Sequence, residues 1–502
     1  MIYQYMRFIF PAGYSRNQEG VLMKAKCSAR LLLHMIGAVM ALLSHQNASA
    51  GQLQVSADFD NGRVKVINID QQTRTIETTI PDDNHTQHTQ MRYWHYRING
   101  ITPGELITIK HSPSTTSLYY AYSYDGKEWF RFGKSGINPI QHRFDSSSVE
   151  LSPNFAYPYS RSIAFCDSIE ALGLAHAQVS TLAISEEGRE VKMLRITDPS
   201  VSDDTKRIVW IQGRQHAFES ASSFIPEGFA QWMISNDAAG AEFRTRVIAY
   251  VIPIMDVDNV YKGMSGKDQP PVDFNRCWNG NPPHWKAVAA AKETLAGLCA
   301  VPDRLAAFFD SHSPYYKQHS GWHWRCNNWT TFKPLFVAAI GEIEGAPFKM
   351  DFHSNDPDGD INSGISAMHV RARWGTAPDY LGATMESSHF KDAGGKMMTV
   401  EGYRQWGEAL GRAIYKHMGG KKTPDSNAVA VVNNGLAVAH RAIWPDREEP
   451  VQIRIMSLDG KCVWQGFGRK AASLWRNFLH SGAYLVYLKA PGVSHVEKLA
   501  IR

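Results

Sequence analysis

The stretch IVWIQGRQHAFES, residues 208–220, indicates both a fold class and a candidate site. It begins as an apolar run typical of a buried strand and continues directly into His216 and Glu219. An imidazole and a carboxylate three residues apart can converge on one metal ion, and Zn²⁺ takes such ligands in catalytic sites. Because His-x-x-Glu also recurs by chance, the pattern requires a third ligand and a base elsewhere in the chain.

Two later stretches supply these groups. LAAFFDSHSPYY, residues 305–316, carries His312, and YLGATMESSHF, residues 380–390, carries Glu386 after a short β-like segment. Two histidines and one glutamate as ligands, with a second glutamate left free, are the groups of a metallopeptidase. There the metal lowers the pKa of a bound water, and the free carboxylate takes the proton and returns it to the leaving amine.

Taken alone, each of these residues has an ordinary interpretation. A single histidine such as His312 is usually a packed core residue, and a single glutamate such as Glu386 usually lies on the surface. Their combination with the first pair favours the functional interpretation. Asp310, two residues before His312, either orients an imidazole or merely ends the strand.

Together these motifs resemble the M14 zinc carboxypeptidases, in the subgroup related to cytosolic carboxypeptidases. The resemblance covers roughly half of the chain and is carried by His216-x-x-Glu219, Pro253 to Val260, Asp273-Phe274-Asn275-Arg276-x-Trp278, His312 and Thr384-Met385-Glu386-Ser387. It implies that His216, Glu219 and His312 bind Zn²⁺. It also implies that Glu386 activates the zinc-bound water as general base and then acts as general acid.

The stretch VDFNRCW, residues 272–278, places an amide beside a planar guanidinium. Asn275 and Arg276 are therefore suited to two-point contact with a carboxylate. The resemblance implies that this carboxylate is the C-terminus of a peptide substrate.

Two groups of the family are missing from the pattern. The family has an arginine before the Asn-Arg pair that stabilises the oxyanion, whereas residues 259–274 contain only Lys262 and Lys267 as cations. Either a lysine replaces it, an arginine comes from elsewhere, or activity is weak or altered. The family's substrate-capping tyrosine is not assignable, because Tyr380 lacks the expected spacing.

Two arginines are the candidates in the sequence for determining substrate specificity. Arg371 and Arg373 lie in HVRARW, residues 369–374, on the way to Glu386. They either line the pocket for the terminal side chain and favour acidic residues, or belong to a solvated strand face.

Composition excludes some classes of function. The chain has 502 residues, 43% hydrophobic and 20% charged, which is typical of a globular protein of two or three domains. Its net charge of +5 is small, and no basic tract is interleaved with aromatic residues, so we expect no nucleic-acid partner. We expect a monomer.

Residues 1–50 resemble an extension followed by a signal peptide. Lys24, Lys26 and Arg30 precede the apolar run LLLHMIGAVMALL, and Ala48-x-Ala50 follows it. A membrane anchor is the alternative, but the run is too short to span a bilayer comfortably. The sequence therefore predicts cleavage near Ala50 and a secreted, periplasmic or cell-surface protein. Cys277 and Cys299 are the expected pair if a disulfide forms.

The remaining chain divides into three predicted domains, which give an α/β fold class: a mixed-sheet zinc carboxypeptidase domain flanked by N-terminal and C-terminal β-sandwich domains. Residues 51–150 read as short strands, residues 151–422 alternate strands and helices, and residues 427–502 return to strands. The last segment is similar to sorting domains of type IX secretion, which implies export machinery as a partner.

Aromatic residues of the first predicted domain have two interpretations. Trp94, Tyr96, Tyr119, Tyr120 and Trp129 either pack in a core or form a carbohydrate-stacking face, and we favour the core.

The sequence thus favours an exported zinc metallocarboxypeptidase acting on peptides. The alternatives are a zinc-dependent amidase, deacylase or esterase on the same scaffold, and a non-catalytic protein that binds peptide or glycan.

Overall fold

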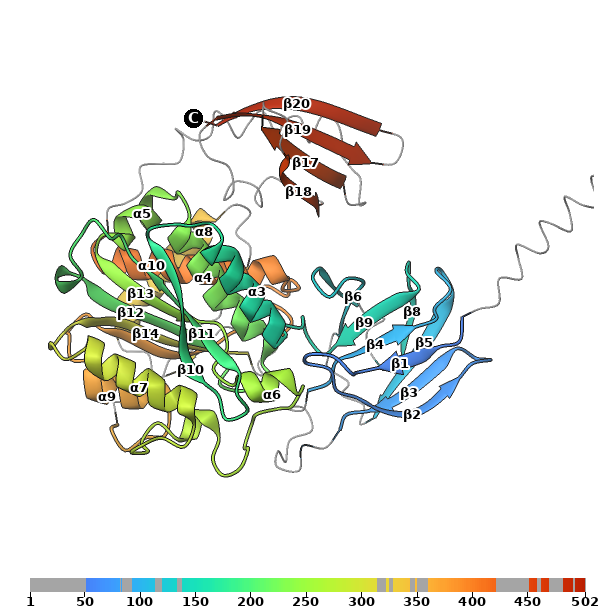
Figure 1. Ribbon diagram of the computed structural model, residues 1–502, viewed down its shortest axis with the longest axis horizontal. Helices are drawn as coiled ribbons and strands as arrows, with labels where there is room; N and C mark the ends of the chain where they lie inside the picture. The colour runs from blue at the N-terminus through green and yellow to red at the C-terminus, as the bar shows by residue number, and fades with distance from the viewer. Residues whose placement is uncertain are drawn as a thin grey trace, which may run out of the picture.

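The computed structural model describes residues 51–81, 83, 93–112, 120–132, 138–313, 322–324, 328–343, 348–349, 360–420, 451–457, 462–468, 482–490 and 493–501. The predicted signal peptide, residues 1–50, lies outside these residues. Figure 1 presents an N-terminal β region, a central α/β region and a C-terminal sheet.

The N-terminal region consists of two sheets. The first has the order β1 (Gln54–Ser56), β4 (Tyr96–Asn99), β9 (Ser148–Ser152), β6 (Ala121–Ser123), β7 (Trp129–Arg131). The second has the order β2 (Lys65–Asp70), β3 (Thr75–Thr79), β5 (Leu106–Ser112), β8 (Ile140–Arg143). The strand pairing of this predicted sandwich is not purely antiparallel, because β3 and β5 run parallel.

Both sheets contribute to one apolar cluster, which makes this region a sandwich with its own core. Ile76 of β3 and Ile98 of β4 are members, and both are fully buried. Three of the five aromatic residues considered for a stacking face, Trp94, Tyr96 and Tyr120, also belong to it. Trp129 is buried against the central region, and Tyr119 lies outside the described residues. The core interpretation is confirmed for the four that are described.

The central region is organised on a seven-stranded mixed sheet. Its order is β10 (Ala177–Ile184), β11 (Glu190–Ile196), β13 (Val247–Ile252), β12 (Arg207–Gly213), β14 (Leu305–His312), β16 (Leu381–Glu386), β15 (Trp322–Trp324). The four strands β13, β12, β14 and β16 are parallel to one another. The predicted mixed sheet is confirmed.

The buried parallel strands follow from their sequences. β13 and β14 are buried at every position, as continuous apolar runs require when helices cover both faces. In Figure 1, α4 (Phe224–Ile234) and α10 (Val400–His417) lie on one side of the sheet, and α7 (Lys286–Leu298) and α9 (Ser366–Trp374) lie on the other. The described residues of this region also form α3 (Tyr159–Glu170), α5 (Ala238–Arg244), α6 (Val257–Tyr261) and α8 (Trp329–Glu342).

Two local predictions differ from the structure. Residues 168–181 read as one helical stretch in the sequence, but in the structure α3 ends at Glu170 and β10 begins at Ala177. HVRARW, for which a solvated strand face was one of the two alternatives, lies in α9, where Val370 is buried and Ala372 is exposed. HVRARW is only six residues long, so its periodicity does not separate helix from strand.

The C-terminal region is described as one antiparallel sheet. Its order is β18 (Cys462–Gly468), β17 (Val451–Ser457), β19 (Gly482–Ala490), β20 (Val493–Ile501). A second sheet, which a sandwich needs, is not among the described residues, and residues 421–450 lie outside them. The C-terminal sandwich and its likeness to sorting domains therefore stay predictions. The monomeric state of the protein also stays a prediction.

Candidate metal centre and active site

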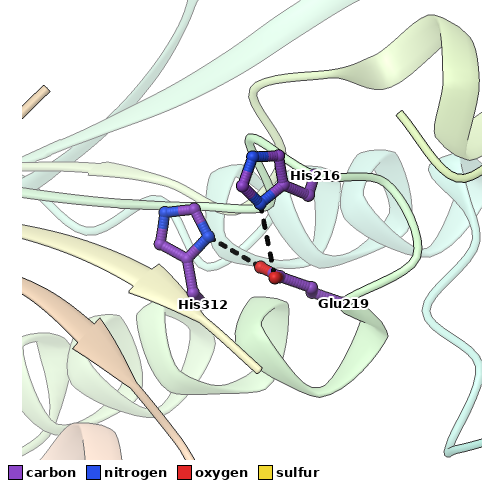
Figure 2. Close-up of side chains that lie close together, drawn as sticks. All are labelled: His216, Glu219 and His312. Carbon is purple, nitrogen blue, oxygen red and sulfur yellow. Dashed lines mark hydrogen bonds and ion pairs between the residues drawn. The ribbon is translucent and has the colours of Figure 1, made fainter. Parts of the chain in front are cut away.

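Three side chains converge at the carboxyl ends of the central parallel strands. His216 and Glu219 follow β12, and His312 ends the neighbouring β14. All three are buried, and one ligand atom from each lies within 4.8 Å of the others. The Glu219 carboxylate lies between the imidazoles, 3.3 Å from Nδ1 of His216 and 2.7 Å from Nδ1 of His312 (Figure 2).

The loop that carries His216 and Glu219 is fixed by a buried arginine. Arg214 adopts a left-handed conformation with φ of 63° and is fully buried. Its Nε and Nη2 donate to the carbonyl oxygen of Ala217 at 2.9 and 2.7 Å, and its Nη1 donates to that of Tyr157 at 3.2 Å. Because its donors are occupied by the protein itself, Arg214 does not serve as the missing oxyanion arginine.

A second carboxylate lies behind each imidazole. The Nε2 of His216 is 3.0 Å from Oδ1 of Asp273, and the Nε2 of His312 is 2.9 Å from Oδ2 of Asp310. An Nε2–H that donates to a carboxylate leaves Nδ1 as the ligand atom and fixes the ring orientation. Of the two interpretations of Asp310, the structure favours the orienting role.

The charges around the imidazoles favour a cation. Burial alone lowers the pKa of His312, but Asp310 and Glu219 outweigh it and raise that pKa well above its usual value. Burial likewise opposes the rise at His216, whose pKa is raised mainly by Asp273. The converging Nδ1 atoms and the Glu219 carboxylate fit a divalent ion, which would displace the protons that this negative environment otherwise retains.

Glu386 lies beside this cluster. It ends β16 and is the direct register partner of His312 across the parallel pair. The residue is half-buried, yet its Oε2 is buried and has no hydrogen-bond partner among the described residues. Burial raises the pKa of Glu386 to about 7, against the opposing effect of His312. A carboxylate with one buried, unpaired oxygen and such a pKa is suited to accept and return a proton.

Asn275 and Arg276 lie in the 3₁₀ turn η6 (Phe274–Arg276) at the same edge. Asn275 is buried, with Nδ2 3.3 Å from Nε2 of His312, and its Oδ1 accepts from the backbone N–H of Ser366 at 2.9 Å. Arg276 is exposed, and within the described residues its guanidinium makes one hydrogen bond, 2.8 Å to the carbonyl oxygen of Asn275. Its remaining donors can reach a ligand.

Arg371 and Arg373 are not brought to the cluster. The first residue of α9, Ser366, donates to Asp310 at 2.6 Å, so the N-terminal end of the helix faces the site. Arg371 and Arg373 lie in the last turn, about 8 to 10 Å further along the axis at 1.5 Å per residue. Arg373 is exposed, and its charge acts on Lys292.

The structure separates the two candidate lysines. Nζ of Lys267 is 2.9 Å from Oδ2 of Asp273 and 3.5 Å from Nε2 of His216. Lys262 instead pairs with Glu187 in a solvent-accessible position. The left-handed Gly266, with φ of +68°, makes the approach of Lys267 possible, because a Cβ there would lie 2.8 Å from the backbone nitrogen of Ala217.

Some residues were missed or wrongly paired by sequence reasoning. Asp273 was part of a motif but had no role assigned; its spacing, two residues before Asn275, was the available signal. Tyr380 is fully buried and does not supply a cap for substrate. The expected disulfide is wrong: Cys277 and Cys299 are free thiols, Cys277 buried after η6 and Cys299 at the end of α7.

Comparisons with known proteins agree with this geometry. Residues 163–296 match the zinc carboxypeptidase family, and residues 55–152 match the cytosolic carboxypeptidase N-terminal domain. Cytosolic carboxypeptidase 6 of Mus musculus is 27% identical over 146 residues, which is 29% of this chain and 26% of that protein. The chain thus matches only about a quarter of the length of this relative.

Solved structures share the fold. A metallo-carboxypeptidase from Burkholderia cenocepacia superimposes with a TM-score of 0.61 at 21% identity, covering 73% of this chain and 99% of that one. A metallo-carboxypeptidase from Pseudomonas aeruginosa, in complex with (2-guanidinoethylmercapto)succinic acid, gives 0.59 at 18% identity, with 73% and 99% coverage. At these identities the solved structures show the shared fold alone. The family models match a zinc carboxypeptidase domain and a cytosolic carboxypeptidase N-terminal domain in this chain, and Zn²⁺ is the cofactor of the zinc carboxypeptidase family.

These relatives contradict the predicted secreted, periplasmic or cell-surface location. Curated relatives from Mus musculus, Homo sapiens and Caenorhabditis elegans are named cytosolic carboxypeptidases. The prediction rested on a short apolar run followed by small residues, a pattern that other N-terminal segments also match. Separately, none of the helices in the described part of the chain has the length and apolar character of a membrane span.

Proposed function

We propose that this chain is a zinc metallocarboxypeptidase that releases C-terminal residues from peptides, with His216, Glu219 and His312 holding the metal and Glu386 as general base and acid. The observation that carries the proposal is the buried, unpaired Oε2 of Glu386 beside the three converging ligand atoms. Bound Zn²⁺ supplies a Lewis acid for the scissile carbonyl and lowers the pKa of a water.

The residues of the chain divide the other tasks. Glu386 takes a proton at its carboxylate and returns it to the leaving amine. Arg276 and Asn275 hold the substrate's terminal carboxylate, the guanidinium through its remaining donors and the amide through Nδ2. Lys267, whose Nζ lies 3.5 Å from Nε2 of His216, is the candidate lysine beside the cluster and would supply the positive charge that stabilises the oxyanion.

The decisive experiment is amino-acid release from a mixed peptide set by the purified, zinc-loaded full-length protein. Peptides with a free C-terminus and the same peptides with a C-terminal amide would be compared. Release from free peptides alone supports the carboxypeptidase. Equal cleavage of blocked substrates would instead support an amidase or deacylase, and absence of both release and zinc would support a binding protein.

Arg276→Ala should raise KM for free-carboxylate peptides about 10- to 100-fold, the loss expected for a charge-assisted hydrogen bond. The kcat should change much less, because the carboxylate is bound in ground and transition states alike. Steady-state kinetics with free and amidated peptides measure both effects.

Arg143→Ala is the matched control, since Arg143 is also exposed and also makes a hydrogen bond to one carbonyl oxygen, that of Gly104 at 2.7 Å. It should leave KM unchanged. An Arg276→Ala protein with wild-type KM would contradict the assignment of Arg276.

Lys267→Met should lower kcat about 100- to 1,000-fold, the usual cost of losing one group that stabilises an oxyanion. Lys267→Arg should retain most of the activity, because it keeps the charge at the same place. Zinc content, measured alongside, should stay close to one ion per chain in both variants.

Lys262→Met serves as the control, because Lys262 pairs with Glu187 rather than with the cluster. Wild-type kcat in Lys267→Met would mean that another group stabilises the oxyanion.

A further inference from the structure

The N-terminal sandwich shares its core with both loops of the candidate site. Phe218 lies between His216 and Glu219, and Phe390 follows Glu386 by four residues. Each has 1% exposure and belongs to the apolar cluster whose other buried members all lie between Leu53 and Leu151. The first loop, which carries His216 and Glu219, and the second loop, which follows Glu386, are therefore both packed into the N-terminal sandwich.

Arg131, the last residue of β7 in the sandwich, contacts the second loop directly. Its Nε donates to the carbonyl oxygen of Met398 and its Nη2 to that of His389, both at 3.0 Å. The same Nη2 donates to Oδ1 of Asn154 at 2.6 Å. The guanidinium also lies 4.1 Å from the ring centre of Phe155 and 5.6 Å from that of Phe390.

Hydrogen bonds to three other parts of the structure hold the segment between Glu386 and Phe390 in place. The backbone N–H of Ser387 donates to the carbonyl oxygen of His312 at 2.8 Å. The single hydroxyl proton of Tyr403 in α10 is shared between the carbonyl oxygens of Ser388 and His389, which lie 2.7 and 3.0 Å from the hydroxyl oxygen. Arg131 completes this set from the sandwich side, so a movement of β7 would be transmitted to the residues that follow Glu386.

The first loop is held by a parallel set of contacts. The backbone N–H of Phe218 donates to the carbonyl oxygen of Ser265 at 2.9 Å. The N–H of Ser265 in turn donates to Oδ2 of Asp83, at 2.7 Å, and Arg63 pairs with the same carboxyl group at 2.9 Å. Asp83 and Arg63 belong to the N-terminal region, so this loop too is positioned from outside the catalytic domain.

We propose that the N-terminal sandwich positions Glu386 relative to His216 and His312, and that Arg131 is the principal positioning residue. This inference rests on the proposed function, in which Glu386 is the base. One oxygen of the Glu386 carboxylate has no hydrogen bond within the described residues, so the backbone on either side must fix its place. A displacement of about 1 Å at a reacting group can cost about a hundredfold in rate.

Arg131→Met, made in the full-length protein, tests the proposal by removing the hydrogen bonds to the second loop while keeping a long apolar stem. Its kcat should fall about 10- to 100-fold, with KM within threefold of wild type and zinc still bound, because only the placement of the base changes. Arg131→Lys should recover little, since one ammonium cannot reproduce the two-point contact. Guanidinium ion added to Arg131→Met should restore part of the kcat.

Arg74→Met is the matched control. Arg74 is a half-buried arginine of the same sandwich whose Nη2 and Nη1 donate to the carbonyl oxygens of Gly100 and Gly51 at 2.8 and 3.0 Å. It should lower the unfolding temperature of the protein but leave kcat unchanged. Equal kcat losses in the two variants would reduce Arg131 to a general stabilising role and overturn the proposal.

Amide hydrogen exchange gives a readout that does not need activity. In Arg131→Met the amides of residues 387–390 should exchange faster, and in Arg74→Met they should not. Unchanged exchange together with wild-type kcat would overturn the proposal. If Arg131→Met does not fold, Phe390→Leu makes a milder change in the same contact and is expected to give the same exchange pattern. A wild-type protein that releases no residue would refute the proposed function, and exchange would still decide the positioning role.

Discussion

Glu386→Gln is expected to abolish peptide hydrolysis while zinc remains bound. The amide has nearly the shape of the carboxylate but cannot accept a proton, and proton transfer of this kind contributes about 100- to 10,000-fold to rate. Because deprotonation of the water and protonation of the leaving amine both depend on this group, we expect a loss of at least about 1,000-fold in kcat. Single-turnover hydrolysis of a labelled peptide, with metal content determined in parallel, measures the effect.

The same substitution should not destabilise the fold at neutral pH. Burial raises the pKa of Glu386 to about 7, above its unfolded value, so the charged form is disfavoured in the folded state. The stability contributed by its neutral form is present below the unfolded pKa and is lost as pH rises through the folded pKa. A permanently neutral glutamine avoids this loss, so the unfolding temperature of the metal-free variant should equal or exceed that of the wild type.

Glu401→Gln is the control for this pair of measurements. Glu401 is half-buried, and burial also raises its pKa, but it lies at the start of α10 beside Arg404. It should keep full activity. A Glu386→Gln protein that still turns over within tenfold of wild type would exclude Glu386 as the base.

The strand sequences predict the part of the site that lies at strand ends. β12 and β14 each contain an apolar run, residues 208–211 and 305–309, because parallel strands are buried on both faces, and such runs are recognised without knowledge of the fold. Side chains at the carboxyl ends of neighbouring parallel strands then meet at one edge. For this reason His216, His312 and Glu386, far apart in the chain, could be placed together from the sequence.

The remaining parts of the site depend on contacts that leave no periodic signal. Lys267 approaches His216 because Gly266 takes a left-handed conformation against Ala217, and nothing in the local sequence distinguishes it from Lys262 in this respect. Phe218 and Phe390 read as ordinary apolar residues of the catalytic domain, although they are buried in the core of its neighbour. Packing between domains is set by shape, which a single sequence does not display.

His312→Ala is expected to remove zinc binding and activity together. Structural or catalytic Zn²⁺ needs at least three protein ligands, and the alanine leaves Glu219 and His216 alone. Metal content after dialysis and the zinc-induced rise in unfolding temperature measure the loss. His176→Ala, which removes a half-buried histidine 3.2 Å from the carbonyl oxygen of Ile234, should behave as wild type in both measurements.

The wild-type protein should bind zinc more tightly as pH rises. Despite the opposing effect of burial, Asp310 and Glu219 raise the pKa of His312 well above its usual value, so protons compete with the metal for Nδ1 through neutral pH. In the metal-free protein the stability from the charged imidazole is present below its unfolded pKa and is lost as pH rises through the folded pKa. The zinc-induced stabilisation should therefore grow from mildly acidic to mildly alkaline solution.

Asp310→Asn separates this explanation from a general pH effect. The variant keeps all three ligands but loses the carboxylate 2.9 Å from Nε2 of His312. Its zinc affinity should fall about 10- to 100-fold, as for other residues that orient a ligand, and its affinity should depend less steeply on pH because His312 retains its proton less strongly. An Asp310→Asn protein whose zinc affinity kept the wild-type pH dependence would show that protons are not held at His312. A His312→Ala protein that still bound zinc tightly would exclude this cluster as the metal site.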